Sequence, residues 1–260
     1  MSVQILSGPP HVIFDAPLVN PSPGGLYAVT QWADQGEPYR WLPRGVQIWT
    51  HNYGGEEAFG VWGADWCTQE APTDVKEGER PPESFLDPFA PITVWAEDHC
   101  DMTVESQDQV RTRAHQNLRL LEQVAVEREF AARMLLDAAS APSVSGLVAA
   151  VGELEDAFAE TNTVGLIHAR PGLASVAAQA QLLVRSGSVL KTPLGHTWVF
   201  GGGYVTALGD KLVATSPTYG WRGEVATRSA TKPEWNRFGV IVERSLVVGY
   251  ESLIGAVTVS

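Results

Sequence analysis

Two short stretches and one histidine carry the residue types that could do chemistry. Asp98-His99-Cys100-Asp101 places two carboxylates, an imidazole and a thiol next to one another, which is the composition of half a metal site or of an activated thiol. Gly201-Gly202-Gly203 is the only glycine triplet, and glycine-rich turns can cradle phosphate. His168 follows a short apolar run, where an imidazole could act as a general base.

Each of these candidates has a simpler structural explanation. No second set of ligands accompanies the 98–101 cluster, and Cys67 and Cys100 lack CxxC or Cys/His spacing, so they are expected to be buried free thiols, with a disulfide between them left open. The glycine triplet lacks the strand–GxGxxG–helix context. His168 fits a core or helix-capping role. The sequence therefore predicts no catalytic, cofactor-binding or metal-binding residue, and a protein that is not an enzyme.

Composition and charge narrow the class of protein further. The 260 residues are 44% hydrophobic, enough for a sizeable core, and no run approaches the roughly 18 apolar residues of a membrane span. The first ten residues show no signal peptide. Of the net charge of −12, residues 51–100 supply most, with 11 acids against Lys76 and Arg80. Residues 201–260 are slightly basic. The acidic surface of one subunit could therefore face a basic surface of another subunit. The alternative is an acidic loop that is simply exposed to solvent. No cluster of Lys and Arg along the chain predicts tight nucleic-acid binding.

The N-terminal 102 residues are expected to be extended and rich in loops. Prolines dominate residues 1–25, which predicts an extended arm that does not fold alone. Six of the nine tryptophans follow within residues 26–95. Short β-prone pieces at 26–29, 45–50 and 91–96, separated by glycine turns, predict an antiparallel ribbon. The Pro- and Glu-rich residues 70–90 are expected to be an exposed loop.

One long helix is predicted over residues 103–139. Apolar residues recur along it at steps of three and four, from Val110 to Leu135, and form one narrow stripe. At 1.5 Å per residue such a helix would span roughly 50 Å. Charged residues cover its other faces, so the helix is expected to lie with one side against a sheet.

The C-terminal half reads as compact α/β structure. A helix capped by Ser143 with an inner face from Leu147 to Phe158, a strand at 163–168, and a helix from Pro171 to a C-cap at Gly187 are predicted. The triplet at 201–203 reads as a flexible joint. Further strands are expected at 189–192, 196–200, 211–215, 223–228, 240–248 and 254–259.

This order of elements resembles the Hong Kong 97 type tailed-phage major capsid protein, whose plan bacterial encapsulin shells share. Residues 103–139 look like the spine helix of that family, residues 26–95 like an elaborated extended loop, and residues 143–204 like the start of its axial domain. The Gly165-Leu166-Ile167-His168-Ala169-Arg170-Pro171 stretch and the Thr192-Pro193-Leu194-Gly195 turn are similar to structural proteins of actinobacterial phages. With four lysines and no catalytic partner for them, the isopeptide cross-linking of some members is not carried over.

The resemblance implies an α+β capsid shell fold with an N-terminal arm (1–25), an extended β-rich loop region (26–102), a spine helix and peripheral-type domain (103–142), an axial-type α/β domain (143–235) and a C-terminal β return (236–260). It implies a structural virion protein that assembles in the host cytoplasm into hexamers and pentamers around double-stranded DNA without sequence-specific binding. Portal, scaffold or decoration proteins are conceivable partners.

Subunit contacts are expected from the arm, the aromatic loop and the charges of the long helix. The candidate contact residues are Phe14, Leu18, Trp41, Trp49, Trp62, Trp66, Arg111, Arg119, Glu127 and Arg133. Three alternatives stay open: an encapsulin-like cellular shell, another virion component for decoration, head completion or the tail, and a cytosolic enzyme that uses His168 or the 98–101 cluster.

Overall fold

The computed structural model describes residues 12, 14–33, 36–62 and 76–260, with the side chain of Glu105 left out. The helices are α1 (Leu26–Val29), α2 (Val104–Ala138), α3 (Leu147–Thr161), α4 (Leu173–Gln179) and α5 (Tyr204–Ala207), with 3-10 turns η1 (Glu56–Ala58) and η2 (Pro233–Trp235). The strands are β1 (Gln31–Trp32), β2 (Ile92–Cys100), β3 (Ser143–Val144), β4 (Leu166–Ala169), β5 (Val184–Ser186), β6 (Val189–Lys191), β7 (Thr197–Phe200), β8 (Lys211–Thr215), β9 (Thr218–Arg222), β10 (Ala226–Lys232), β11 (Arg237–Tyr250) and β12 (Leu253–Val259).

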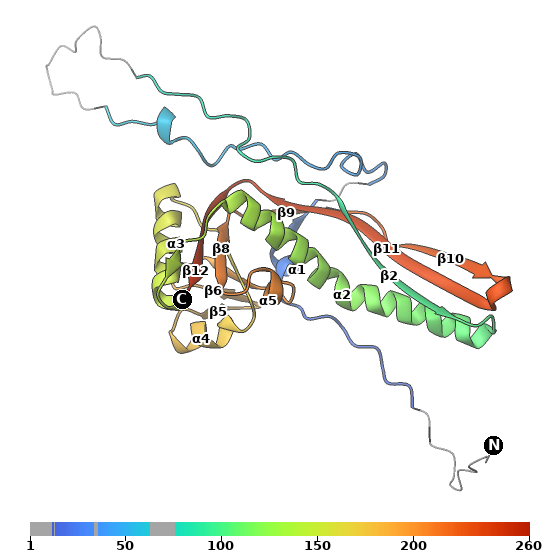
Figure 1. Cartoon of the computed structure of the whole chain (residues 1–260). Coiled ribbons are helices and arrows are strands. Elements are labelled where there is room, and N and C mark those ends of the chain that lie inside the picture. Colours follow the sequence, from blue (N-terminus) through green and yellow to red (C-terminus); the bar gives the residue numbers. More distant parts are fainter. Residues whose placement is uncertain (1–11, 13, 34–35, 63–75) are drawn as a thin grey trace, which may run out of the picture.

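A seven-stranded mixed sheet, ordered β3-β12-β8-β4-β7-β6-β5, forms the compact part of the molecule. The helix α3 packs on it through the apolar row that its sequence spacing predicts, because residues at i, i+4, i+7 and i+11 share one helix face. Leu147, Val151, Leu154 and Phe158 are all buried there, together with Leu173 of α4. Figure 1 shows this compact part around α3, α4, β8 and β12.

The second sheet is built around the 14-residue strand β11. It has the order β1-β9-β11-β10, with β2 also paired to β11. The first part of β11 lies between β10 and β2, and its last residues pair with β9. Figure 1 shows β2, β10 and β11 drawn out into a long tongue beside α2.

The helix α2 is one uninterrupted element of 35 residues that runs the length of this tongue. Its N-terminal half packs Val110, Ala114 and Leu118 against Phe238, Val240 and other buried side chains of β11. Farther along, Val126, Phe130 and Met134 enter the core that joins both sheets. The predicted long helix with one buried face against a sheet is therefore confirmed.

Several local expectations are wrong. Residues 26–29 form the helix α1 rather than a strand, and 45–50 form no strand but only a bridge from Val46 to Phe89. Within the described part of 26–95 the predicted ribbon forms no regular sheet of its own, and β2 pairs with β11 instead. Ser143 lies in β3, and Gly146 precedes α3. The helix α4 ends at Gln179, and Gly187 lies, with φ of 63°, in the turn between β5 and β6.

The glycine triplet is a packed contact rather than a flexible joint. Gly201 is buried, and a Cβ atom placed there would meet Glu127 Cδ of α2 at 2.6 Å. A Cβ atom on Gly203 would meet the Cβ of Glu127 at the same 2.6 Å. Side chains cannot be accommodated at either position, so glycine lets the backbone before α5 approach the long helix.

Candidate assembly surfaces

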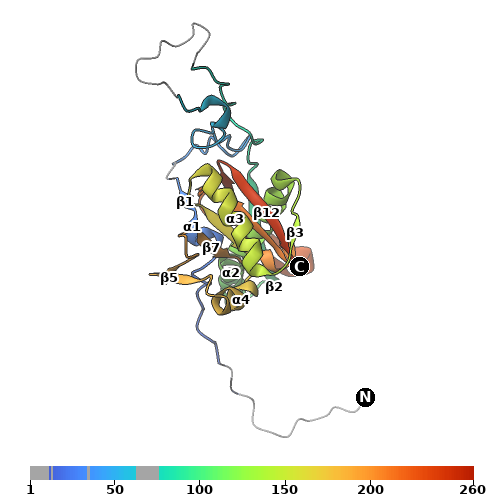
Figure 2. The same ribbon diagram turned by 90° about the vertical axis from the view of Figure 1, so that its left-hand side faces the viewer.

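Two segments project from the body and carry several exposed apolar side chains. One is the arm, residues 14–25, and the other is the extended loop, residues 42–62 and 76–91. Figure 2 shows the two leaving the body in opposite directions. Phe14 of the arm is 80% exposed and Phe59 of the loop 79% exposed. Leu18, Val19, Trp49, Val61 and Phe85 are exposed on the same two segments. Exposed apolar side chains gathered in this way mark surfaces that become buried on association.

A polar stripe on α2 holds the arm by its backbone. Gln116 donates to the Val19 carbonyl at 2.7 Å, and Gln123 donates to the Gly24 carbonyl at 2.7 Å. Between them Arg119 donates to the Asn20 side chain. The three residues share one face of the helix with Glu127, one to two turns apart. The arm therefore runs parallel to α2, in the same chain direction, while its apolar side chains stay exposed.

Glu127 ends this stripe in a fully buried junction of three segments. Its carboxylate accepts hydrogen bonds from the Leu26 N–H at 3.0 Å, from Gln123 at 2.8 Å and from the Gly203 N–H at 2.8 Å. No cation is among these partners. Backbone and amide donors thus satisfy the buried carboxylate, as burial of a charged group requires. The junction ties the root of the arm and the start of α5 to the long helix.

The extended loop is a sparse antiparallel hairpin. Its two limbs meet at Val46 and Phe89, at Thr50 N–H to the Glu83 carbonyl (2.8 Å), and at Glu79 N–H to the Glu57 carbonyl (2.9 Å). These widely spaced contacts give the limbs a ribbon-like course without a regular ladder. The predicted ribbon is therefore present in outline, but not as strands.

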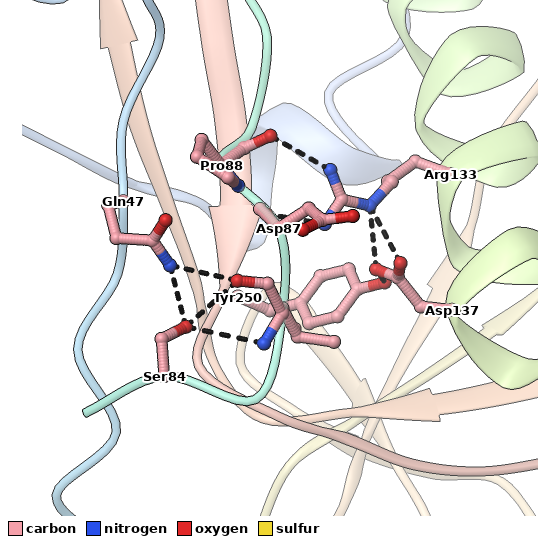
Figure 3. A network of polar contacts seen from close by, with 8 residues as sticks. Gln47, Ser84, Asp87, Pro88, Arg133, Asp137 and Tyr250 are labelled. Atoms are coloured by element: carbon pink, nitrogen blue, oxygen red, sulfur yellow. Dashed lines mark hydrogen bonds and ion pairs between the residues drawn. The ribbon is translucent and has the colours of Figure 1, made fainter. Parts of the chain in front are cut away.

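Arg133 of α2 pins the root of the loop (Figure 3). Its guanidinium donates to the Asp87 carbonyl at 2.6 Å and the Pro88 carbonyl at 3.1 Å, and lies over the Phe89 ring at 4.3 Å. The same side chain donates to both carboxylate oxygens of Asp137 at 2.8 Å. Tyr250 of β11 donates to Asp137 at 2.6 Å, and its burial together with this carboxylate raises the Tyr250 pKa. One arginine thus joins the loop, the long helix and the central strand.

The predicted contact residues divide into four groups, the last of which is the buried pair Trp41 and Glu127. Phe14, Leu18 and Trp49 are exposed on the projecting segments, and Trp62 is 37% exposed with Lys76 over its ring. Arg111, Arg119 and Arg133 are partly exposed but engaged within the chain, by Asp108, Asn20 and the loop root. Trp66 lies outside the described residues.

Trp41 and Glu127 require correction as contact residues. Trp41 is 4% exposed and packs in the main core, and Glu127 is completely buried. A neighbouring subunit could reach neither side chain on this folded chain. Both residues hold the projecting segments from inside instead. No sequence pattern marks Glu127 as buried, because a glutamate on a long charged helix looks solvated.

His168 is a structural residue. It is completely buried, with Nε2 2.9 Å from the Thr215 hydroxyl and Nδ1 3.0 Å from the Tyr204 hydroxyl. Thr215 donates to the Ser216 carbonyl, so it accepts from Nε2–H, and Nδ1 accepts from Tyr204. Burial lowers the pKa of His168 to about 3. This imidazole is neutral at physiological pH and is sealed from any substrate.

The 98–101 cluster lies at the far end of β2 and is spread over both strand faces. Asp98 pairs with Arg113 at 2.5 Å, Cys100 donates to the Asp101 carbonyl, and Asp101 accepts from Thr103. Cys100 is half-exposed rather than buried, and Cys67 lies outside the described residues. Within the described ranges no three His, Cys, Asp or Glu side chains are placed to hold a metal ion, and no helix there could span a membrane.

Solved structures with a similar fold were found, although sequence comparisons found no match. No protein-family model and no curated protein matches the sequence. The chain is similar to the capsid of an empty GTA particle, with a TM-score of 0.55 and 9% identity over 97% of this chain and 94% of the other. It is also similar to a protein of Microbacterium phage Oxtober96, with a TM-score of 0.50 and 11% identity over 100% and 96%.

A weaker likeness extends to the SrpI encapsulin of Synechococcus elongatus, with a TM-score of 0.48 and 12% identity over 66% of this chain and 74% of that chain. That score is too low to carry an argument. The first two likenesses cover almost the whole of both partners and include the arm, the loop, the long helix and the compact α/β part. The chain has the mixed α+β fold of phage-type capsid shells.

Proposed function

We propose that this chain is the major capsid subunit of a tailed phage, which assembles into hexamers and pentamers of an icosahedral shell around double-stranded DNA. The observation that carries the proposal is the pair of projecting segments on a capsid fold. The arm and the loop are held to the body by their roots and leave apolar side chains such as Phe14 and Phe59 exposed. A subunit that overlaps its neighbours would bury these side chains.

The role is mechanical, and no catalytic residue takes part. A closed shell gains stability from many modest contacts repeated by symmetry, so a subunit needs large complementary edges rather than a pocket. In this proposal residues 1–25 form the arm, 26–102 the loop region, 103–142 the spine helix and peripheral part, 143–235 the axial part and 236–260 the β return. The Hong Kong 97 type is the member of the fold that this layout resembles.

Negative-stain electron microscopy of the purified recombinant protein, with its size-exclusion profile, tests the proposal. Closed shells, tubes, or rings of five or six subunits are expected. A monomer or small oligomer that persists at high concentration would contradict self-assembly and favour a virion component that forms only on a scaffold or portal partner.

The contents of shells made in cells decide between the two kinds of container. Nuclease-protected double-stranded DNA supports the phage capsid. A protein cargo without DNA would instead make the chain an encapsulin-like compartment shell.

A further inference from the structure

A groove of about 710 Å³ lies between the arm, α2 and the second sheet. Leu18 and Pro21 of the arm form part of its lining. Four arginines line it as well, and they come from three elements: Arg111 and Arg119 from α2, Arg222 from β9 and Arg244 from β11. The helix α2 is far in the sequence from β9 and β11, so the four arginines come together only in the folded chain.

Two of the four arginines are paired with a carboxylate, Arg244 with Glu122 and Arg111 with Asp108, and the other two leave the groove positively charged. Glu122 is the only carboxylate among the described residues that line it. Its side chain is 8% exposed and already accepts hydrogen bonds from Tyr27 at 3.1 Å and from Arg244 at 3.2 Å. The Nε of Arg244 is buried and has no partner in the described part of the chain.

Among the described residues, the other two arginines have no carboxylate partner. Arg119 donates to the side-chain oxygen of Asn20, and neither Arg119 nor Arg222 makes an ion pair with a described residue. The guanidinium of Arg222 lies over the Trp32 ring at 4.6 Å, and Trp32 in turn meets Tyr27 edge to face at 5.0 Å. A guanidinium held flat on an aromatic ring keeps its N–H edge free for an anion.

We propose that this groove binds the phosphate backbone of nucleic acid, and that it is where the subunit contacts enclosed double-stranded DNA. The proposal rests on the proposed capsid function, since that function supplies the DNA. Arginine forks match phosphate oxygens with two parallel hydrogen bonds. The groove volume suits a short piece of backbone rather than a duplex, so the contact reads no base sequence.

The acidic loop of a second subunit is the competing occupant, and it fits less well. A nucleic-acid strand offers one negative charge about every 3.4 Å along its axis. In the loop, Lys76 and Arg80 flank the acids Glu77 and Glu79, so a copy that docks through residues 76–80 would bring two cations into a cationic groove. Regularly spaced phosphates without such cations are the better complement.

Fluorescence anisotropy of a labelled 20-base-pair DNA duplex of mixed sequence (roughly two helical turns) with the unassembled subunit, over a range of salt concentrations, tests the proposal. Arg119→Gln and Arg222→Gln each remove a guanidinium that pairs with no carboxylate in the part of the chain that the structure describes, so both variants should fold. Each is expected to weaken binding about 3- to 10-fold and to reduce the salt slope by about 1. Arg185→Gln, which removes an exposed arginine of β5, is the matched control and should bind as the unaltered chain does.

Three results would overturn the inference. They are no DNA binding by the unaltered subunit at low salt, equal binding by the groove variants and the control, and groove variants that bind DNA normally but no longer assemble. The last result would indicate that the acidic loop of a second subunit, rather than DNA, binds in the groove. If the protein forms shells but the groove variants bind DNA as well as the control does, only the inference about the groove is refuted. If the groove variants bind DNA more weakly but the unaltered protein forms no shells, only the capsid function is refuted.

Discussion

At the scale of single residues, the buried carboxylate of Glu127 makes the sharpest prediction. Glu127→Ala would leave the Leu26 and Gly203 N–H groups without their acceptor, and an unsatisfied buried donor costs about 1–3 kcal/mol. We expect the free energy of unfolding of the subunit, measured in urea, to fall by about 3 kcal/mol. Glu129→Ala, at an exposed position of the same helix, is the control and should change it by less than about 0.5 kcal/mol. Equal effects would show that the junction is not a structural anchor.

His168 makes the fold sensitive to acid. Its pKa is about 3 in the folded chain and 6.5 in its ordinary range, so below pH 6.5 the unfolded chain binds a proton that the folded chain does not. Stability contributed by the neutral imidazole is therefore present above pH 6.5 and is lost as the pH falls toward 3. Between pH 7 and pH 5 the loss is about 2 kcal/mol.

His168→Gln isolates this contribution, because the amide can still pair with Tyr204 or Thr215 but does not titrate. The unfolding free energies of the two chains, measured at several pH values, should converge by about 2 kcal/mol as the pH falls from 7 to 5. Parallel pH dependences of the two chains would contradict the assignment of His168 as a buried neutral residue.

At the scale of elements, Arg133 is predicted to fix the root of the extended loop. Arg133→Lys keeps a charge near Asp137 but cannot bridge the Asp87 and Pro88 carbonyls at once, because a lysine lacks the planar fork. Limited proteolysis should cleave the loop several times faster, while the body resists as before. Arg128→Lys, an exposed change on the same helix, is expected to leave the cleavage rate unaltered. Equal cleavage rates would mean that other contacts hold the loop.

The sequence predicts best those elements whose apolar residues follow a clear pattern along the chain. The long helix is found where the pattern places it, since one-sided burial sets the spacing of its apolar residues. The strand β8 (Lys211–Thr215) is also found in place, as a short apolar run buried on both faces. Residues 26–29 are also apolar, but four residues are too few to separate a helix from a strand. The pairing of β2 with β11 joins residues more than a hundred positions apart, and no local signal encodes it.

The residues that hold the arm, and the basic groove, could not be predicted from the sequence for a related reason. Glu127 and Gln123 look like solvated residues of a charged helix until the arm covers them. Arg119 and Arg222 form no run along the chain, and only the packing of α2 beside β9 and β11 brings them to one groove. Such sites depend on long-range contacts, whereas the exposed aromatic residues of the arm and loop are visible in the composition alone.

At the scale of the whole molecule, the projecting segments are predicted to be required for assembly of subunits into a shell. The double variant Phe14→Ser, Leu18→Ser removes apolar surface that contributes little to the folded subunit, because both side chains are mostly exposed. We expect its unfolding free energy to stay within about 0.5 kcal/mol of the unaltered chain, while shells or rings disappear from electron micrographs.

The control for this variant is Val164→Ser, which changes an exposed valine of the compact body between α3 and β4. It should assemble normally if the arm, rather than exposed apolar surface in general, makes the subunit contacts. Each arm contact repeats once per subunit in a closed shell, so a loss of 1–2 kcal/mol per contact, about 5- to 30-fold in each association constant, is enough to abolish assembly. Normal shells from the double variant would move the subunit contacts to the extended loop, where Trp49 and Trp62 would be the residues to change next.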